Sequence, residues 1–278
     1  MNNYIESFTL PYLTCKVGYP YDVLAPKNLH MIKLDPITIL YGSNGSGKST
    51  LLNIMARKLG VDMQDRGNDG EFLQHVIDEC CFSLNPLWSS SSIPMESRFI
   101  RSEEVMHSIV KDRKRNEAIK RHVKEIRPDL FEQFFLGTPN SDRSYVWDDD
   151  KWIFSTVSAF SDGRSNGEKA FDYFQDNVNI DSVTLLDEPE NSLAPKLQKQ
   201  LADMILNYSR FFNCQFIIAT HSPFILSIPQ STPPTAWAGM MPSPTSTRIT
   251  FRWSWSSWRG SSRTAASGSR RIFSTAIC

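Results

Sequence analysis

The chain of 278 residues contains few cysteines, and they show no spacing typical of metal binding or redox chemistry. The five are Cys15, Cys80, Cys81, Cys214 and Cys278, and no C-x-x-C motif occurs among them. Disulfide scaffolds and cysteine-ligated metal sites depend on regular spacings of this kind. We therefore expect neither, and a reducing compartment fits the sequence.

Long apolar runs and a leader sequence are also missing. No run approaches the roughly 20 apolar residues that a membrane-spanning helix needs. Residues 1–6 have neither the basic stretch nor the apolar stretch of a secretory signal peptide. We therefore expect a cytoplasmic protein without a membrane span.

Lysine and both acidic residues are absent from residues 231–278, which contain six arginines and several tryptophans. Leu, Val, Asn, Gln, His and Tyr are missing there as well. This abrupt change predicts that residues 231–278 are a disordered or out-of-frame tail; a tail that binds nucleic acid or membranes is the alternative. Residues 1–230 carry 24 basic and 30 acidic side chains, a net charge of −6 that argues against nucleic-acid binding through net charge.

One glycine-rich segment has the spacing G-x-x-x-x-G-K-S/T of a phosphate-binding loop (P-loop), between a strand-like run at 37–41 and a helical pattern at 51–56. In such a loop, backbone N–H groups surround phosphate oxygens, and the N-terminus of the following helix favours the same anion. We predict that Lys48 contacts the β- and γ-phosphates of ATP and that Ser49 binds Mg²⁺. The candidate nucleotide contacts are Gly42, Ser43, Asn44, Gly45, Ser46, Gly47, Lys48, Ser49 and Thr50.

Two further apolar strands, at about 182–187 and 215–219, are separated by a helical pattern at about 194–209. Strand–helix–strand order with continuous apolar strands is typical of a parallel sheet buried on both faces. Ligands of such sheets bind at the carboxyl ends of the strands. The residues that follow these strands are therefore candidates for the same site as the P-loop.

Two acids and a histidine follow these strands. Asp187 is predicted to hold Mg²⁺, and Glu188 to orient and deprotonate the attacking water. His221 is placed to hydrogen-bond the γ-phosphate. Alone, each would be explained as well by a helix cap or a structural role, but together with Lys48 they form a candidate catalytic set.

The turn Ser165-Asn166-Gly167-Glu168 precedes a helical pattern. Ser165 and Glu168 have the spacing of a capping box. The same turn offers a hydroxyl group and helix N-terminal N–H groups to an anion. Ser165, Gly167 and Glu168 are therefore candidates for nucleotide contact as well as for a helix cap.

Taken in order, G-S-N-G-S-G-K-S-T, S-N-G-E, L-L-D-E-P-E-N-S-L and A-T-H-S-P resemble the nucleotide-binding domain of the ABC ATPase superfamily, and within it the stand-alone AAA-family ATPases similar to SMC and RecF proteins. The resemblance covers residues 1–230. It identifies Gly42 to Thr50 with the Walker A loop, Ser165 to Glu168 with the signature motif, Val183 to Glu188 with Walker B, Glu190 to Leu193 with the D-loop, and His221 with the switch histidine.

The resemblance implies an α/β fold: a P-loop NTPase with an ABC-type three-layer sandwich, a mostly parallel central sheet, N-terminal antiparallel strands and a helical insertion at about 71–150. It also implies a homodimer that holds two ATP molecules with Mg²⁺ between its subunits. Ser165 and Gly167 of one subunit would cover the γ-phosphate bound by the other. We therefore expect a cytoplasmic ATPase that yields ADP and phosphate, in DNA repair, maintenance or defence.

Two departures from the family pattern keep alternatives open. The signature is S-N-G-E instead of the L-S-G-G-Q of transporters, and no glutamine accompanies Arg98-Phe99-Ile100-Arg101, near the expected glutamine loop. The alternatives are an ATP-binding transporter subunit, a small-molecule P-loop kinase and a slow ATP-dependent switch.

A helical block before residue 130 carries many lysines and arginines opposite an apolar face of Ile119, Val123, Ile126 and Leu130. Acidic residues are interspersed with the basic ones, so a solvated surface is the simpler interpretation. Contact with DNA or a partner protein is the alternative.

Overall fold

The computed structural model describes residues 3–13, 18–27, 29–64, 70–88, 92–126, 128, 164–228 and 235–236. The chain divides into one unit of Met1–Gly239 and a second of Met240–Cys278. The second unit lies wholly outside the described residues, and the fold is that of the first.

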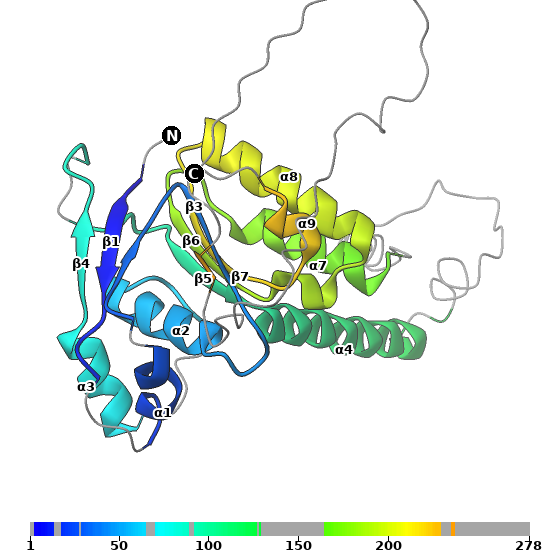
Figure 1. Cartoon of the computed structure of the whole chain (residues 1–278). Helices are drawn as coiled ribbons and strands as arrows, with labels where there is room; N and C mark the ends of the chain where they lie inside the picture. The colour runs from blue at the N-terminus through cyan, green and yellow to red at the C-terminus, as the bar shows by residue number, and fades with distance from the viewer. Residues whose placement is uncertain are drawn as a thin grey trace, which may run out of the picture. The chain divides into compact units, whose positions relative to one another are not determined.

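The centre of the first unit is a parallel sheet with the strand order β5-β6-β7-β3-β8 (Figure 1). Strands β6 and β7 are both buried along their whole length, as their continuous apolar sequences predict for a sheet covered on both faces. The carboxyl ends of β3, β6 and β7 lie at the same edge, since Leu40 and Asp187 both pair with Ala219. The strands are β3 (Ile37–Tyr41), β5 (Arg98–Arg101), β6 (Val183–Asp187), β7 (Gln215–Ala219) and β8 (Thr235–Ala236).

A smaller antiparallel sheet has the order β2-β1-β4. Its strands are β1 (Ile5–Thr9), β2 (Met31–Lys33) and β4 (Cys81–Leu84). Gln215 ties this sheet to the parallel one, because its side-chain oxygen accepts hydrogen bonds from the N–H groups of Tyr4 and Ile5, both at 2.9 Å. The predicted α/β fold, with a parallel sheet and antiparallel strands near the N-terminus, is confirmed.

Helices cover both faces of the parallel sheet, with α2 and α8 on opposite sides of the strands (Figure 1). On one face, α2 (Lys48–Leu59) and α3 (Glu71–Glu79) share an apolar core with the antiparallel sheet. On the other, a second core joins α4 (Ser102–Ile126), α7 (Asn166–Asn177), α8 (Pro195–Phe211) and α9 (Pro223–Leu226). Alternation along β7 separates the two: Ile217 faces the first core, and Phe216 and Ile218 face the second. Short helical turns complete the described elements: α1 (Tyr21–Leu24), η1 (Ala25–Lys27) and η2 (Pro189–Ser192).

The region at about 71–150, which we predicted as a helical insertion, is not helical throughout its described part. It contains α3 and α4, but also β4 and β5. β5 belongs to the parallel sheet because it pairs with β6, and its Phe99 and Ile100 enter different cores. A strand this short, between two arginines, has too little alternation to be predicted from sequence. Residues 127 and 129–150 lie outside the described part of the chain.

Two residues of the predicted tail form β8, pairing Thr235 with Leu40 and Ala236 with Tyr41. The rest of residues 231–278 lies outside the described residues, so the hypothesis of a disordered or out-of-frame tail stays a prediction. Within the part of the chain that is described, no helix is long and apolar enough to cross a membrane.

Candidate active site

The P-loop turns sharply between β3 and α2. Gly45 and Gly47 have φ angles of 71° and 94°, in the left-handed region that residues with a Cβ rarely adopt. The turn delivers the chain directly into α2 at Lys48, and no side chain caps this end of the helix. The first N–H groups of a helix lack partners within the helix. An anion in the loop can therefore accept hydrogen bonds from the N-terminus of α2.

Lys48 is buried, and its ammonium group lies at the centre of the site. It donates hydrogen bonds to the carbonyl oxygens of Gly42 at 2.9 Å and Ser43 at 3.2 Å. Its Nζ also lies 2.9 Å from Nε2 of His221. Because an ammonium group can only donate, Nε2 is the acceptor in a hydrogen bond between these two atoms. Burial lowers the pKa of Lys48, while the charges of Glu188, Asp187 and Glu190 act in the opposite direction.

Asp187 is the last residue of β6, and its carboxyl group is buried. Burial raises its pKa to about 6, although the hydrogen bond from Ser49 opposes that rise. The Ser49 hydroxyl donates to Oδ1 of Asp187 at 3.0 Å. A hydroxyl and a carboxylate side by side are hard oxygen donors of the kind that Mg²⁺ prefers.

Glu188 follows β6 in a left-handed backbone conformation with φ of 46°. Its backbone N–H donates to the carbonyl oxygen of Ala219 at 2.8 Å, which joins the ends of β6 and β7. Its carboxylate accepts a hydrogen bond from Asn191 at 2.9 Å and places Oε1 3.4 Å from Nε2 of His221. A strained backbone at a residue with a side chain often marks a functional position. The strain here directs a partly exposed carboxylate toward Lys48 and His221.

The structure thus brings Lys48, Ser49, Asp187, Glu188 and His221 together, from three strand ends that are far apart in sequence. It does not bring the signature turn to the same place through any described hydrogen bond. Arg113 of α4 donates to the Asn166 side chain at 3.0 Å. The bonds of Ser165 and Glu168 are local: Glu168 accepts from Ser165 N and Oγ, both at 2.8 Å, and Ser165 Oγ accepts from Glu168 N at 3.3 Å. This is the predicted capping box at the start of α7. The bond from the Ser165 backbone is the main reason that the pKa of Glu168 is lowered.

Gly167 has a packing role that the sequence did not reveal. A Cβ built at this position would lie 3.1 Å from Cδ1 of Leu197 and 3.6 Å from the carbonyl oxygen of Ser192. α7 therefore packs closely against the segment that leads from η2 into α8. This contact explains a glycine here without any ligand, while leaving the first turn of α7 exposed.

One neighbour of the site was not predicted. The end of β5 lies beside Asp187, because Arg101 pairs with it in the sheet, and the charge of Glu103 in the first turn of α4 raises the Asp187 pKa further. These residues occupy the edge where the sequence offered no glutamine. One signal in the sequence pointed to this edge, the position of Arg98-Phe99-Ile100-Arg101 near the expected glutamine loop. That signal did not identify which side chain would lie beside Asp187.

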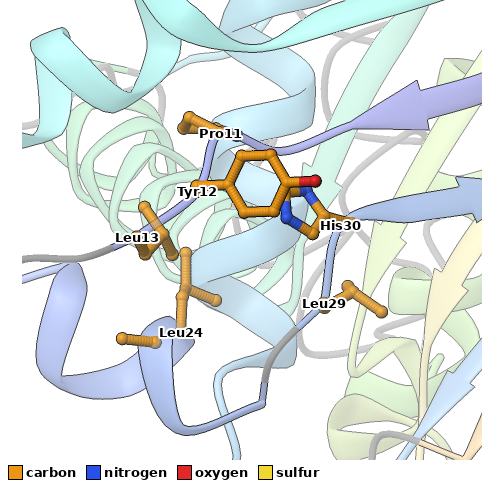
Figure 2. Close-up of a pocket in the computed structure, with 7 residues that line it drawn as sticks. Pro11, Tyr12, Leu13, Leu24, Leu29 and His30 are labelled. Atoms are coloured by element: carbon orange, nitrogen blue, oxygen red, sulfur yellow. The ribbon is translucent and has the colours of Figure 1, made fainter.

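A separate small hollow of about 160 Å³ lies near the end of β1 (Figure 2). Tyr12 and His30 stand against each other at one side of it, and leucines from neighbouring segments line the other. None of the residues that line it belongs to the P-loop or to the predicted catalytic set. The lining residues are Pro11, Tyr12, Leu13, Leu24, Ala25, Leu29 and His30.

A strand, a P-loop and a helix, with an acidic pair and a histidine at neighbouring strand ends, define a P-loop ATPase domain. The chain belongs to the family described as "AAA domain, putative AbiEii toxin, Type IV TA system", whose model matches residues 64–227. The match begins after the P-loop, which is identified by its own motif and geometry. A comparison with curated protein sequences gives no match.

Solved structures similar to this chain include heads of SMC proteins and an ABC cassette. The SMC head domain from Thermotoga maritima is 13% identical, with a TM-score of 0.37 over 81% of this chain and 91% of that one. The Smc head domain bound to the C-terminal domain of ScpA, from Pyrococcus furiosus, is 13% identical, with a TM-score of 0.38 over 80% and 91%. A nucleotide-free ATP-binding cassette of an ABC transporter is 15% identical, with a TM-score of 0.36 over 81% and 84%.

Proposed function

We propose that this protein binds ATP with Mg²⁺ and hydrolyses it to ADP and phosphate, as a cytoplasmic homodimer. One observation carries the proposal: a buried lysine, a hydroxyl–carboxylate pair, a strained glutamate and a histidine converge where three parallel strands end. This position is the ligand-binding edge of an open α/β sheet. Charge stabilisation and positioning are what phosphoryl transfer needs from a protein.

The residues divide into binding and reacting groups. The loop of Gly42–Thr50 surrounds the phosphates, and Lys48 exchanges its bonds to Gly42 and Ser43 for bonds to phosphate oxygens. Ser49 and Asp187 would hold Mg²⁺, which when bound neutralises charge on the β- and γ-phosphates. Described residues contain no group of three or more His, Cys, Asp or Glu arranged to hold a metal by itself. Mg²⁺ in nucleotide sites takes one or two protein ligands, with the remainder from phosphate and water, so the pair fits.

Glu188 acts as the general base. It accepts a proton from the water that attacks the γ-phosphorus, and its bond from Asn191 keeps the carboxylate aimed. His221 donates to the γ-phosphate once Lys48 has moved to the nucleotide. The Nε2 atom that now accepts from Lys48 must then carry the proton, which requires a change of tautomer or protonation of the ring.

The signature residues complete the site from a second subunit. The exposed first turn of α7 presents the Ser165 hydroxyl, and its bonds within the chain are those of a cap. An isologous dimer would place this turn over the partner's P-loop, twice by symmetry. We propose this ATP cycle for DNA maintenance, repair or defence; the family description, which includes a toxin–antitoxin system, supports the last.

The decisive variant is Glu188→Gln. The amide keeps the shape of the side chain but cannot accept the proton of the attacking water, so hydrolysis should fall about 100-fold or more, while ATP binding persists. Because closure depends on bound ATP, the variant should accumulate as a dimer when ATP and Mg²⁺ are present. Phosphate release and light scattering after size exclusion measure both effects, with Glu6→Gln as a control at an exposed glutamate outside the site. Hydrolysis at the parental rate would show that Glu188 is not the base.

A further inference from the structure

A second glutamate, Glu190, holds the loop that carries His221. Glu190 lies in η2, three residues after the end of β6, and its half-buried carboxylate accepts hydrogen bonds from three donors of residues 220–222. The Thr220 hydroxyl donates to Oε2 at 2.8 Å, and the Ser222 backbone N–H donates to Oε1 at 3.1 Å. The third donor is the backbone N–H of His221, also to Oε1. Both carboxylate oxygens are thus engaged by one loop.

Gln198 of α8 supports this arrangement from the other side. Its amide nitrogen donates to the carbonyl oxygens of Leu193 at 2.9 Å and Glu190 at 3.4 Å. Its amide oxygen accepts from the Ser222 hydroxyl at 2.8 Å. The same hydroxyl caps α9. Glu190 and the loop of residues 220–222 are therefore both anchored to the start of α8.

His221 itself gains little support from packing, since 36% of its side chain is exposed. Its ring nonetheless places Nε2 2.9 Å from Nζ of Lys48 and 3.4 Å from Oε1 of Glu188. A partly exposed ring keeps such a position only if its backbone is held. The three bonds to Glu190 supply that restraint at residues 220, 221 and 222.

We propose that Glu190 is a positioning residue for ATP hydrolysis, which acts through His221 by fixing the backbone of the loop after β7. The inference rests on the proposed function, because it assigns His221 its role there. A carboxylate matches these partners, because the two backbone N–H groups can only donate and the Thr220 hydroxyl gives its own proton to Glu190 while accepting from the Ser222 N–H at 2.9 Å. An amide at this position would turn its NH₂ group either toward the two N–H groups, which would lose their acceptor, or toward the Thr220 hydroxyl, which would have to give up its donor bond and accept instead.

The first test is Glu190→Gln, with Glu6→Gln as the matched control at an exposed site. Loss of a residue that orients a reacting group typically lowers activity 10–100-fold. We expect that loss mainly in kcat, because Glu190 makes no described hydrogen bond to the P-loop and its charge has the smallest effect of the three acidic charges that act on Lys48. Glu190→Asp, which keeps the carboxylate on a shorter side chain, should recover part of the rate. An unchanged kcat, or a loss confined to KM, would overturn the proposal.

A double-mutant cycle with His221→Ala separates positioning from a general structural effect. If Glu190 acts through His221, the double variant hydrolyses ATP no more slowly than His221→Ala alone. If the rate loss of the double variant equals the product of the two single-variant losses, Glu190 acts independently of His221 and the proposal is wrong. Thermal unfolding of each variant verifies that the proteins compared are folded.

A measurement on the unaltered protein covers the case in which Glu190→Gln does not fold. The backbone N–H of His221 should exchange slowly with deuterium although His221 is exposed, because it donates to Glu190. Rapid exchange at this N–H would contradict the restraint. This readout needs no turnover, so it stands even if the protein hydrolyses no ATP, in which case the proposed function fails separately.

Discussion

At the scale of single residues, the site concentrates charge in a place that water reaches poorly. Lys48 and Asp187 are both buried. Burial lowers the pKa of Lys48 and raises that of Asp187, so in each case it favours the neutral form of the side chain. Folding therefore holds these groups at a cost in stability that nucleotide and Mg²⁺ would relieve. Sites that bind charged ligands often carry such a cost.

Asp187→Asn tests this cost in the nucleotide-free protein. The pKa of Asp187 rises from 3.8 unfolded to about 6 folded. Above pH 6 the carboxyl is ionised in both states, and the folded state bears the full desolvation penalty, about 3 kcal/mol for a shift of this size. As pH falls from 6 toward 3.8, the folded state takes up the proton first and the wild type gains stability. Below 3.8 both states are neutral.

The variant is neutral at every pH, so its free energy of unfolding should exceed that of the wild type above pH 6 and match it near pH 4. Urea unfolding across this range, without nucleotide or Mg²⁺, measures the difference. Asp203→Asn, at an exposed position on α8, is the control and should show no such trend. If the variant is more stable than the wild type by the same amount at every pH, the charge of the Asp187 carboxylate is not the cause of the difference.

At the scale of elements, α7 begins with a motif that forms a helix cap and for which we propose a second role. Its capping box is complete inside the chain, so Ser165 and Glu168 are explained by helix formation alone. Its exposed first turn is also what a partner's nucleotide would meet. The two roles differ in what they require: a cap needs an acceptor at residue 165, whereas contact with a phosphate needs a small hydroxyl donor.

Two substitutions at Ser165 separate these roles. Ser165→Ala removes the cap and should lower stability by about 1 kcal/mol. Ser165→Asn keeps an acceptor and should leave stability close to that of the wild type, while its larger amide obstructs the partner's phosphate. Both should lose ATP-induced dimerisation, measured by light scattering in the Glu188→Gln background. If Ser165→Asn dimerises normally, the turn is a cap without a role between subunits.

α4 corrects the predicted amphipathic pattern. Val123 is buried, but Ile126 is 59% exposed, so the apolar face is narrower than the spacing of Ile119, Val123 and Ile126 suggested. Arg113 donates to the Asn166 side chain at 3.0 Å, and Arg115 pairs with Asp112 at 3.2 Å. The basic face is therefore partly engaged within the chain, and the choice between a solvated surface and contact with DNA or a partner protein stays a prediction. Leu130 lies outside the described residues.

At the scale of the whole molecule, the proposed site is shared between two chains, each contributing a different part. A P-loop variant and a signature variant should then complement each other. Lys48→Ala destroys the P-loop of its own chain but retains an intact signature turn, and Ser165→Asn does the reverse. In a mixed dimer, one of the two sites combines an intact P-loop with an intact signature.

Equal amounts of the two variants should therefore recover at most about half of the wild-type activity, since each mixed dimer has one intact site of two. Each variant alone is inactive in the same assay of phosphate release. A mixture of Lys48→Ala with Glu188→Gln serves as the control, because both changes damage the same half-site and should recover nothing. Failure of the first mixture to regain activity would show that Ser165 does not act across subunits.

Local order was predictable wherever the determining interactions are close in sequence. The P-loop turn and the capping box of α7 both agree with the structure, because glycine conformations and helix caps depend on a few neighbouring residues. β6 and β7 were equally clear, since a strand buried on both faces is apolar throughout. β5 was missed because its four residues acquire a strand identity only by pairing with β6.

The sequence by itself determined the chemistry available to this protein: a loop that holds phosphate, an acidic pair and a histidine. Tertiary structure decided which of these groups meet. Parallel pairing of β3, β7 and β6 brings Lys48, His221 and Asp187 to one edge, and a left-handed residue at 188 aims a carboxylate across it. It also decided that Glu190 bonds to the loop of His221, because hydrogen bonds between residues some thirty positions apart depend on how strands are ordered and not on local pattern.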